Sequence, residues 1–403
     1  MFLVSGAMAQ WFQQNSGTTN NLNSVYFTDS NTGYVVGDTG TIIKTNDGGE
    51  NWRPQNSGTV KDLYSVHFTT DETGYAVGDN VILKTENDGL VWISQSMPIP
   101  GNWHSVYFTS TDTGYIVGEA GNACILKTIN GGLTWNINYI YYGPGIIDSY
   151  FTTVCFTDAN TGYAGGSYMV QTIESGGLLL KTTNGGTDWT ELSLPNSDHI
   201  DDVCFLNTDT GYAIKGEIGW VSDSLLKTTN GGLTWQTQNI SSATLMYLDH
   251  IFFTNADTGY VVGWLGTILK TMNGGPDYSS QSTGTTNWLV SVYFPASDTG
   301  YCVGTNGTIL KTTNGGGYPV GINDYNPSSD NLSIHPNPAS TSITIETPSP
   351  GQLNILNLNG QPLLTRRVKE TKTFFDISTL PSGVYVVKVV GEKGVKVGKV
   401  IKQ

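Results

Sequence analysis

Histidines, cysteines and carboxylates are the residues of this sequence that could bind a metal ion or carry out acid–base chemistry. The histidines lie far apart in the chain, and no two of them have the spacing of a metal-binding motif. They are His67, His104, His199, His250 and His335. No glycine-rich phosphate loop, nucleophile elbow or EF-hand loop occurs either. We therefore expect no catalytic residue, no cofactor site and no metal site.

Acidic residues are plentiful, and glycoside hydrolysis requires only two carboxylates that flank the scissile bond. The best candidates for such a pair are Asp201–Asp202, Asp148 and Glu217. Nothing in their spacing singles out a pair, so we interpret them as solvated surface acids. A binding module is therefore the leading hypothesis. An extracellular carbohydrate-active enzyme is the alternative, and activity assays with Asp and Glu substitutions would separate the two.

The elements that must position these residues come from an internal repeat. The triplet Thr-Gly-Tyr occurs seven times, at intervals of 40 to 49 residues. Its glycines are Gly33, Gly74, Gly114, Gly162, Gly211, Gly259 and Gly300. This period suits a propeller blade of four strands. In the first repeat we predict strands at Ser24–Phe27, Gly33–Val36, Thr41–Lys44 and Asn51–Arg53, and for the whole region an all-β, seven-bladed β-propeller.

A recurrent turn sequence follows the third strand of each repeat, as in Thr45-Asn-Asp-Gly-Gly-Glu-Asn-Trp52. The Asp or Asn at its third position can accept hydrogen bonds from nearby backbone N–H groups, and its glycines can adopt the positive φ of a tight hairpin. The Trp is expected to pack between neighbouring sheets. The third-position residues are therefore predicted to be structural: Asp47, Asn87, Asn130, Asn184, Asn230, Asn273 and Asn314.

The last repeat ends at Tyr318 without a convincing fourth strand. The N-terminal segment Trp11–Gly17 is similar to Trp52–Gly58, which forms the fourth strand of the first repeat. We therefore predict that the N-terminal strand pairs into the final blade and closes the ring, because closure removes exposed sheet edges.

These repeats resemble the Asp-box propellers, most closely the photosystem II stability/assembly factor-like family, in their succession of Gly-Tyr, Gly-x-Ile-x-Lys-Thr and Gly-Gly-x-x-Trp. The resemblance covers residues 11–318, with departures at Asp88, Tyr278 and Tyr318. Sialidases also carry Asp boxes, but they surround the substrate carboxylate with three arginines. Arg53 is the one arginine of the repeats, which excludes a sialidase and restricts the enzymatic alternative to a non-sialidase glycoside hydrolase.

After a polar linker the chain changes character. Residues 1–331 carry 10 Lys/Arg and 29 Asp/Glu, whereas residues 332–403 carry 9 and 4. The motifs at His335–Pro338, Leu353–Gly360, Leu380–Tyr385 and Lys399–Lys402 resemble the type A C-terminal sorting domain of the type IX secretion system of Bacteroidetes. This resemblance implies a small β-sandwich domain and the type IX secretion machinery as a partner. The acidic repeats make nucleic acid an improbable partner, because phosphate binding requires clustered cations.

The expected location is the extracellular space or the outer cell surface. Residues 1–9 read as the end of a signal peptide, with Ala7-Met-Ala9 as a cleavage site. We divide the remainder into a propeller (10–318), a linker (319–331) and a sorting domain (332–403). No run of about 18 apolar residues predicts a transmembrane helix. The four cysteines replace core residues of single repeats, so we expect buried free thiols at Cys124, Cys155, Cys204 and Cys302.

Differences between the repeats indicate where an extracellular glycan or protein ligand would bind. The third to fifth repeats carry extra residues between their second and third strands, and the connection from Trp135 to Val154 is also long. In a propeller blade these connections emerge on one face. Aromatic rings there suit sugar stacking or protein contacts, and acids suit hydroxyl groups. The predicted ligand-binding residues are Tyr139, Tyr141, Tyr142, Asp148, Tyr150, Tyr168, Glu217 and Trp220, although packing of these loops on one another is an equal alternative.

Overall fold

The computed structural model describes residues 11–170, 174–194, 199–216, 223–238, 240, 247–275, 277–317, 332–347, 351–357, 362–368, 370, 372–391 and 394–403. The chain divides into two compact units, Met1–Gly321 and Ile322–Gln403. Glu217, Trp220, the predicted signal segment (1–9) and the whole predicted linker (319–331) lie outside the described residues. In the part of the chain that is described, no helix is long and apolar enough to cross a membrane.

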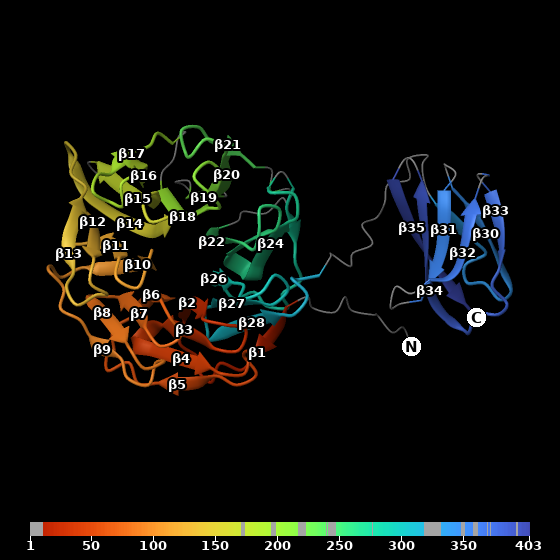
Figure 1. Cartoon of the computed structure of the whole chain (residues 1–403), viewed down its shortest axis with the longest axis horizontal. Helices are drawn as coiled ribbons and strands as arrows, with labels where there is room; N and C mark the ends of the chain where they lie inside the picture. The colour runs from red at the N-terminus through yellow and green to blue at the C-terminus, as the bar shows by residue number, and fades with distance from the viewer. Residues whose placement is uncertain are drawn as a thin grey trace. The chain divides into compact units, whose positions relative to one another are not determined.

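The first unit is a ring of seven four-stranded antiparallel sheets, as Figure 1 shows from one face of the ring. Blade 1 contains β2 (Leu22–Phe27), β3 (Gly33–Gly37), β4 (Thr41–Thr45) and β5 (Arg53–Gln55). Blade 2 contains β6 (Leu63–Phe68), β7 (Gly74–Gly78), β8 (Val81–Thr85) and β9 (Ile93–Ser94). Blade 3 contains β10 (Asn102–Phe108), β11 (Gly114–Glu119), β12 (Ala123–Thr128) and β13 (Asn136–Ile140). Blade 4 contains β14 (Ile146–Phe156), β15 (Gly162–Val170), β16 (Glu174–Thr182) and β17 (Thr190–Glu191).

The remaining blades follow the same order. Blade 5 contains β18 (His199–Phe205), β19 (Gly211–Gly216), β20 (Ser224–Thr228) and β21 (Gln236–Thr237). Blade 6 contains β22 (Leu248–Phe253), β23 (Gly259–Gly263), β24 (Thr267–Thr271) and β25 (Ser279–Ser280). Blade 7 contains β26 (Leu289–Tyr293), β27 (Gly300–Gly304), β28 (Thr308–Thr312) and the N-terminal strand β1 (Phe12–Gln14). Short 3-10 turns, η1 (Asp38–Gly40) and η2 (Trp264–Gly266), connect the middle strands of blades 1 and 6.

The N-terminal strand closes the ring, as predicted. β1 pairs antiparallel with β28, with Phe12 opposite Lys311. Trp11 is fully buried and meets Phe294 edge to face, with ring centroids 5.8 Å apart. Blade 7 therefore gains its fourth strand from residues nearly 300 positions away in the sequence.

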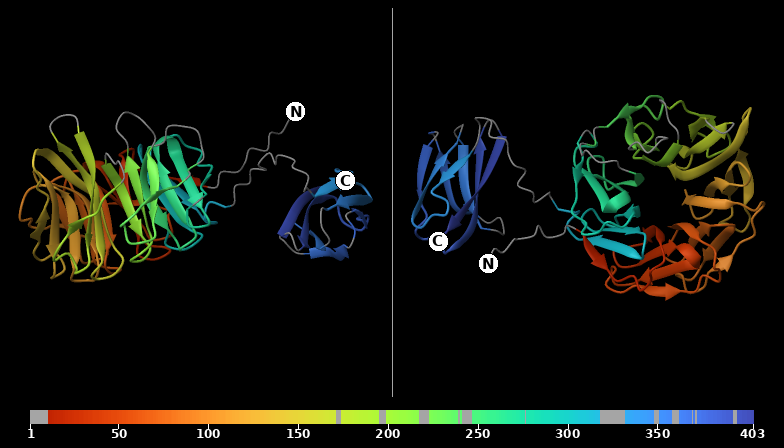
Figure 2. Two further views of the ribbon diagram at one scale, coloured as in Figure 1. Left: turned by 90° about the horizontal axis from the view of Figure 1, so that it is seen from above. Right: turned by 180° about the vertical axis from the view of Figure 1, so that it is seen from behind.

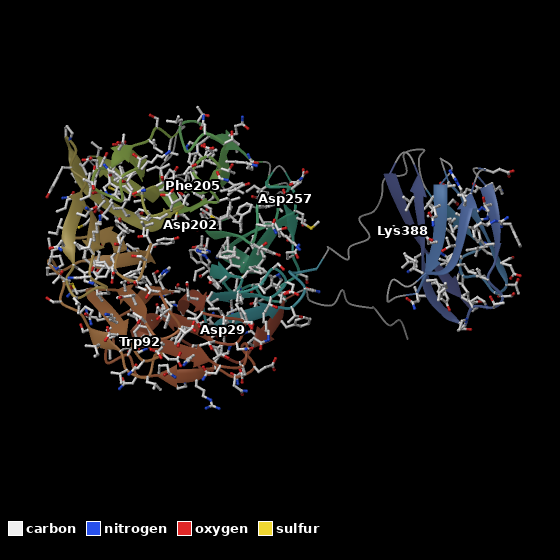
Figure 3. The ribbon with its side chains drawn as sticks, in the orientation of Figure 1. Asp29, Trp92, Asp202, Phe205, Asp257 and Lys388 are labelled. Atoms are coloured by element: carbon white, nitrogen blue, oxygen red, sulfur yellow. The ribbon has the colours of Figure 1, made fainter. Side chains whose placement is uncertain are left out.

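The Asp-box turns are structural, as predicted from their composition. In the first box the N–H of Asn51 donates to Oδ1 of Asp47, and the Thr45 hydroxyl donates to the same atom. The box Trp packs between blades: Trp92 of blade 2 belongs to a buried cluster with Tyr34 of blade 1. Figure 3 places Trp92 toward the outside of the ring. Fourth strands begin after this Trp, so the predicted strand at Asn51–Arg53 lies two residues too early.

The first strand of each blade lies innermost and contacts the first strands of both neighbouring blades. At several of these contacts, a serine hydroxyl oxygen accepts a hydrogen bond from a backbone N–H of the next blade. Ser24, for example, accepts from Val66 at 3.3 Å, and Ser65 accepts from Val106 at 3.3 Å. Ser105 and Ser291 accept in the same way from Val154 and Val25. We call this repeat position the latch position.

All four cysteines are free thiols, but only Cys124 and Cys302 are buried as expected. Cys155 and Cys204 are partly exposed. The prediction of burial was wrong for these two because the position that they share with Tyr26 lies on the innermost strands and is only partly covered whichever residue occupies it, Tyr26 included.

The second unit is the predicted small β-sandwich. One sheet contains β29 (Ser333–His335), β30 (Ser342–Glu346) and β33 (Lys372–Asp376). The other contains β31 (Gly351–Leu356), β32 (Pro362–Val368), β34 (Gly383–Gly391) and β35 (Gly394–Lys402). Apolar residues of both sheets, such as Ile343, Phe375, Leu353 and Val387, form one buried core between them.

Candidate functional site

One face of the propeller carries the turns between second and third strands together with the connections between blades. We call it the insertion face. Blade 4 is longest there: β14 has 11 residues and β15 has 9, whereas β2 and β3 of blade 1 have 6 and 5. Seen edge-on, the strands of blade 4 extend beyond those of blade 1 (Figure 2, left). We predicted that the candidate ligand-binding residues would lie in long loops. Most of them lie on strands instead, because the strands of blade 4 continue where a loop was expected.

Three of the predicted aromatic residues pack against the protein itself. Tyr139, Tyr141 and Tyr168 are partly buried against the core cluster shared by blades 3 and 4. The rings of Tyr141 and Tyr168 lie 5.9 Å apart, and the Tyr141 hydroxyl donates to Oε2 of Glu191 at 3.4 Å. Burial, with the Glu191 charge beside it, raises the pKa of Tyr141 to about 12. These tyrosines stabilise the extended strands.

The other predicted residues are more accessible but do not form one cluster. Tyr142 is 74% exposed. Tyr150 is partly buried, with its ring 6.3 Å from that of His104. Asp148 is exposed on β14 and lines a hollow on the insertion face.

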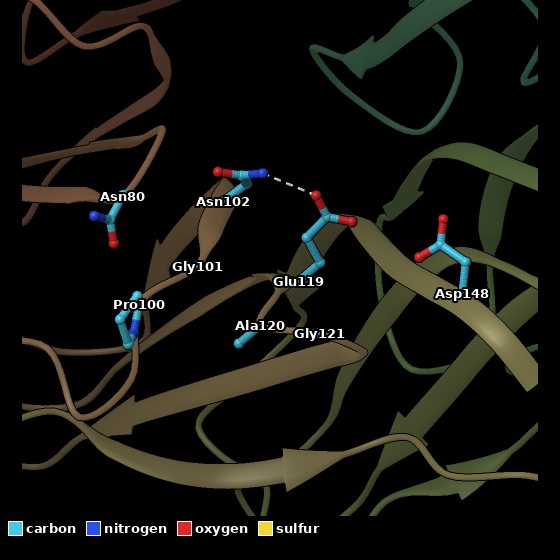
Figure 4. Close-up of a pocket in the computed structure, with 8 residues that line it drawn as sticks. All are labelled: Asn80, Pro100, Gly101, Asn102, Glu119, Ala120, Gly121 and Asp148. Atoms are coloured by element: carbon cyan, nitrogen blue, oxygen red, sulfur yellow. Dashed lines mark hydrogen bonds between the residues drawn. The ribbon is translucent and has the colours of Figure 1, made fainter.

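This hollow has a volume of about 500 Å³ and lies between the turns of blades 2 to 4. Figure 4 shows its lining, in which the side-chain amide of Asn102 donates to Oε1 of Glu119 at 2.9 Å. Two carboxylates, two side-chain amides and the bare backbone of two glycines make it polar. Its lining residues are Asn80, Pro100, Gly101, Asn102, Glu119, Ala120, Gly121 and Asp148.

A second group of polar residues gathers on the inner strands of blades 5 and 6. Asp202 occupies the latch position of blade 5, and its Oδ2 accepts the N–H of Ile251 at 2.9 Å. His250 occupies the latch position of blade 6, and its Nδ1 accepts the N–H of Val292 at 3.4 Å. Nε2 of His250 lies 3.7 Å from Oδ2 of Asp202. Figure 3 shows Asp202 at the inner side of the ring.

Two further carboxylates stand one residue before these latches. Oδ2 of Asp201 lies 3.2 Å from Nε2 of His199. The His199 ring lies directly against Gly216, because a Cβ atom added to Gly216 would lie only 1.8 Å from that nitrogen. Asp249 accepts a hydrogen bond from the indole N–H of Trp288. Burial raises the pKa of Asp249 to about 8, and repulsion by Asp201, Asp223 and Asp202 adds to this shift although the Trp288 bond opposes it.

Asp202 is also affected by its surroundings. Its burial raises the pKa, although His250 and the hydrogen bonds from Ile251, Thr153 and Val203 act in the opposite direction. The Thr153 hydroxyl donates to Oδ1 at 2.7 Å. A carboxyl group in this position therefore holds its proton more strongly than a surface acid does.

His199, Asp201 and Asp223 offer ligand atoms that all lie within 4.8 Å of one another. Asp223 is buried and also accepts the N–H of Leu248 at 2.6 Å. One imidazole and two carboxylates are a donor set that divalent transition metals accept. The expectation of no metal site rested on the absence of two histidines with metal-ligand spacing, whereas this set combines one histidine with two aspartates from two segments of blade 5.

The sequence indicated Asp201 and Asp202 as candidate acids and Asp223 as a hydroxyl acceptor near the long loops, but it did not indicate His199, Asp249 or Trp288. A comparison of the repeats at the position of Asp201 contains the missing signal. The equivalent residues in chain order are Asn23, Tyr64, His104, Thr152, Asp201, Asp249 and Val290. Two adjacent blades thus carry acids where the others do not.

Comparison with known proteins agrees with this architecture. Residues 4–106, 89–198 and 182–282 match the family described as photosynthesis system II assembly factor YCF48, and together they span more than half of the chain. The chain belongs to this family. Residues 333–403 match the secretion system C-terminal sorting domain. This domain marks the chain as a protein that is secreted or displayed at the cell surface, and it implies contact with the secretion machinery.

Solved structures share the fold at low sequence identity. YCF48 bound to D1 peptide has a TM-score of 0.61 and 17% identity, covering 76% of this chain and 98% of its own. A GH74 xyloglucanase from Xanthomonas campestris has a TM-score of 0.58 and 10% identity, covering 97% and 68%. PorZ of Porphyromonas gingivalis, a surface component of the type IX secretion system, has a TM-score of 0.56 and 11% identity, covering 93% and 58%. Among curated proteins, none matches this sequence.

Proposed function

We propose that this protein is a secreted or surface-attached binding module that captures a glycan or protein ligand on its insertion face. The observation that carries the proposal is that the blades differ from one another on that face. There blade 4 is extended, a polar hollow lies between blades 2 to 4, and blades 5 and 6 carry acids at a position where the other blades have none. The Asp-box face repeats the same turn in each blade.

The relatives are consistent with ligand capture. The solved YCF48 structure contains a bound D1 peptide, so a propeller of this family can hold a polypeptide. PorZ is described as a bacterial surface component. We infer that the sorting domain directs the propeller through the type IX secretion system of a member of the Bacteroidetes, after removal of residues 1–9, and that an adhesive role follows if the protein stays attached.

The proposal also assigns boundaries and site residues. We place the propeller at residues 10–318, the linker at 319–331 and the sorting domain at 332–403. We propose Tyr142, Asp148 and Tyr150 as the contact residues on blade 4. Glu217 and Trp220 remain candidates on sequence grounds. In this proposal Tyr139, Tyr141 and Tyr168 do not contact the ligand, but pack against the core and hold the strands of the site in place.

The test is ligand capture by the full chain, with a glycan array and a pull-down from the bacterial cell surface. Tyr142→Ala and Asp148→Ala should weaken capture and leave the melting temperature within a few degrees, because both side chains are exposed. Leu133→Ala is a matched surface control, since Leu133 is 73% exposed in an Asp-box turn of the opposite face. Full capture by the double variant Tyr142→Ala/Asp148→Ala would place the contact elsewhere.

A glycoside hydrolase is the second candidate, and one observation favours it. Asp249 retains its proton near neutral pH, as the general acid of such an enzyme must, and Asp201 stands close by as a second carboxyl group. Release of reducing sugar from polysaccharides by the wild type, abolished in Asp249→Asn, would favour the enzyme over the binding module.

A further inference from the structure

Two tryptophans on the insertion face are exposed, unlike the tryptophans of the Asp boxes. Trp264 is 38% exposed and Trp288 is 40% exposed, whereas Trp52, Trp92 and Trp135 are buried between blades. Trp264 opens the turn η2 of blade 6, and Trp288 directly precedes β26 of blade 7. Because η2 packs against β26, the two indoles belong to one surface.

The equivalent turn of blade 1 is a built-in comparison. Thr39 and Leu265 share the same left-handed backbone, with φ of 54° and 53°. The first two positions of this turn are Asp38 and Thr39 in blade 1, but Trp264 and Leu265 in blade 6. Leu265 is 53% exposed, so its side chain gains little from burial to offset the unfavourable left-handed backbone. The fold therefore does not require apolar residues at this turn.

Carboxylates border the exposed aromatic residues. The indole N–H of Trp288 donates to Asp249, which fixes the ring beside that carboxyl group. The ring of Tyr247 meets that of Trp264 edge to face at 5.6 Å. Asp201 and Asp223 lie close enough to Asp249 to repel its charge. The result is an apolar surface of two indoles and a leucine with hydrogen-bond acceptors at its edge.

This combination matches the chemistry of a pyranose ring. The C–H face of a sugar packs on an indole, and its hydroxyl groups form hydrogen bonds with the oxygens of a carboxyl group. We propose that Trp264, Trp288 and Asp249 form a binding site for a neutral, pyranose-containing glycan. The proposal rests on the proposed function and names the ligand class of the insertion face.

The net negative charge of the propeller determines whether neutral or acidic glycans can bind at this site. Residues 1–331 carry 29 acidic and 10 basic side chains, and none of the three proposed site residues is basic. Sulfated glycans and uronates would therefore be repelled, because they place negative charge on a surface that bears a large excess of acidic side chains, Asp201 among them. Neutral polysaccharides meet no such repulsion.

The experiment measures binding of the full chain to galactomannan, xylan and mixed-linkage β-glucan, with polygalacturonate and chondroitin sulfate as acidic probes. Affinity electrophoresis and quenching of tryptophan fluorescence give independent readouts. We expect binding to at least one neutral polysaccharide and to neither acidic one. Trp264→Ala and Trp288→Ala should each weaken it at least tenfold, and Trp288→Tyr should retain part of it. Phe12→Ala is the matched control, because Phe12 is an exposed ring on the outermost strand of blade 7.

The outcomes separate this inference from the proposed function. Equal binding by the wild type and by Trp264→Ala/Trp288→Ala, with both melting at the same temperature, overturns the site. Failure of the wild type to bind any neutral probe overturns the ligand class, and the proposed function stands if a cell-surface protein is still captured. Absence of any captured ligand, glycan or protein, overturns both.

Discussion

Oδ2 of Asp202 accepts a hydrogen bond of 2.9 Å from the backbone N–H of Ile251, and so performs between blades 5 and 6 the task that serine performs between other blades. A carboxyl group is not needed for this bond, since Ser24, Ser65, Ser105 and Ser291 make it with a hydroxyl oxygen. The carboxyl group adds a contact that the serines lack, because its second oxygen, Oδ1, accepts the Thr153 hydroxyl of blade 4 at 2.7 Å.

This relationship predicts different stabilities for two variants of Asp202. In Asp202→Ser the hydroxyl oxygen can still accept the Ile251 N–H, whereas Asp202→Ala leaves that donor unpaired. An unpaired buried donor costs about 1–3 kcal/mol. Urea denaturation should therefore find the serine variant more stable than the alanine variant by about that amount. Ser65→Ala, which leaves the Val106 N–H unpaired, is the matched control. Equal stability of the two Asp202 variants would show that the hydrogen bond is of no consequence.

The raised pKa of Asp249 predicts a pH dependence of stability. An acid whose folded pKa is about 8 and whose unfolded pKa is about 4 favours the folded state only while protonated, so stability falls as pH rises from about 4 to about 8. Asp249→Asn should remove this loss and be more stable than the wild type by about 2–4 kcal/mol at pH 8, but not at pH 4. Asp29→Asn is the control of opposite sign, because hydrogen bonds from Thr32 lower the pKa of Asp29. A wild-type stability that rises over this pH range would contradict the assignment.

Ring closure predicts a large cost for the loss of Trp11. This side chain is fully buried against Phe294 and Tyr260, so Trp11→Ala should lower the free energy of unfolding by about 3–5 kcal/mol. Phe12→Ala, one residue further along the same strand, removes a half-exposed ring and should cost less than about 1 kcal/mol. Similar losses in both variants would show that the strand is not locked into blade 7 by Trp11.

The sorting domain predicts a defect in export rather than in folding. Because the propeller has its own cores, deletion of residues 332–403 should leave its thermal transition in place and trap it inside the cell envelope. Fractionation and immunoblotting with the full chain beside it measure the location. Normal appearance of the truncated chain in the medium would remove the domain's proposed role.

The fold could be predicted because its signals recur in every repeat. Gly-Tyr, the Asp box and the Trp mark each blade, and the similarity of Trp11–Gly17 to Trp52–Gly58 predicts the closing strand. The site was harder, because its residues meet only in three dimensions. Asp201 and Asp249 lie 48 positions apart yet occupy the same place on adjacent blades. Tyr139 and Tyr168 were predicted to lie in binding loops, but the strands simply continue and bring their rings onto the core.

The measurement that tests the central claim most directly compares the two faces of the propeller with a matched pair of substitutions. Leu265 lies in a turn of the insertion face and Leu133 in an Asp-box turn of the other face, with 53% and 73% of their side chains exposed. The full chain carrying Leu265→Glu or Leu133→Glu is incubated with immobilised galactomannan, xylan and β-glucan and with intact bacterial cells, and the retained protein is quantified. We expect Leu265→Glu to lose retention at least tenfold and Leu133→Glu to match the wild type. Retention lost in Leu133→Glu and kept in Leu265→Glu would contradict the assignment of the insertion face as the binding surface.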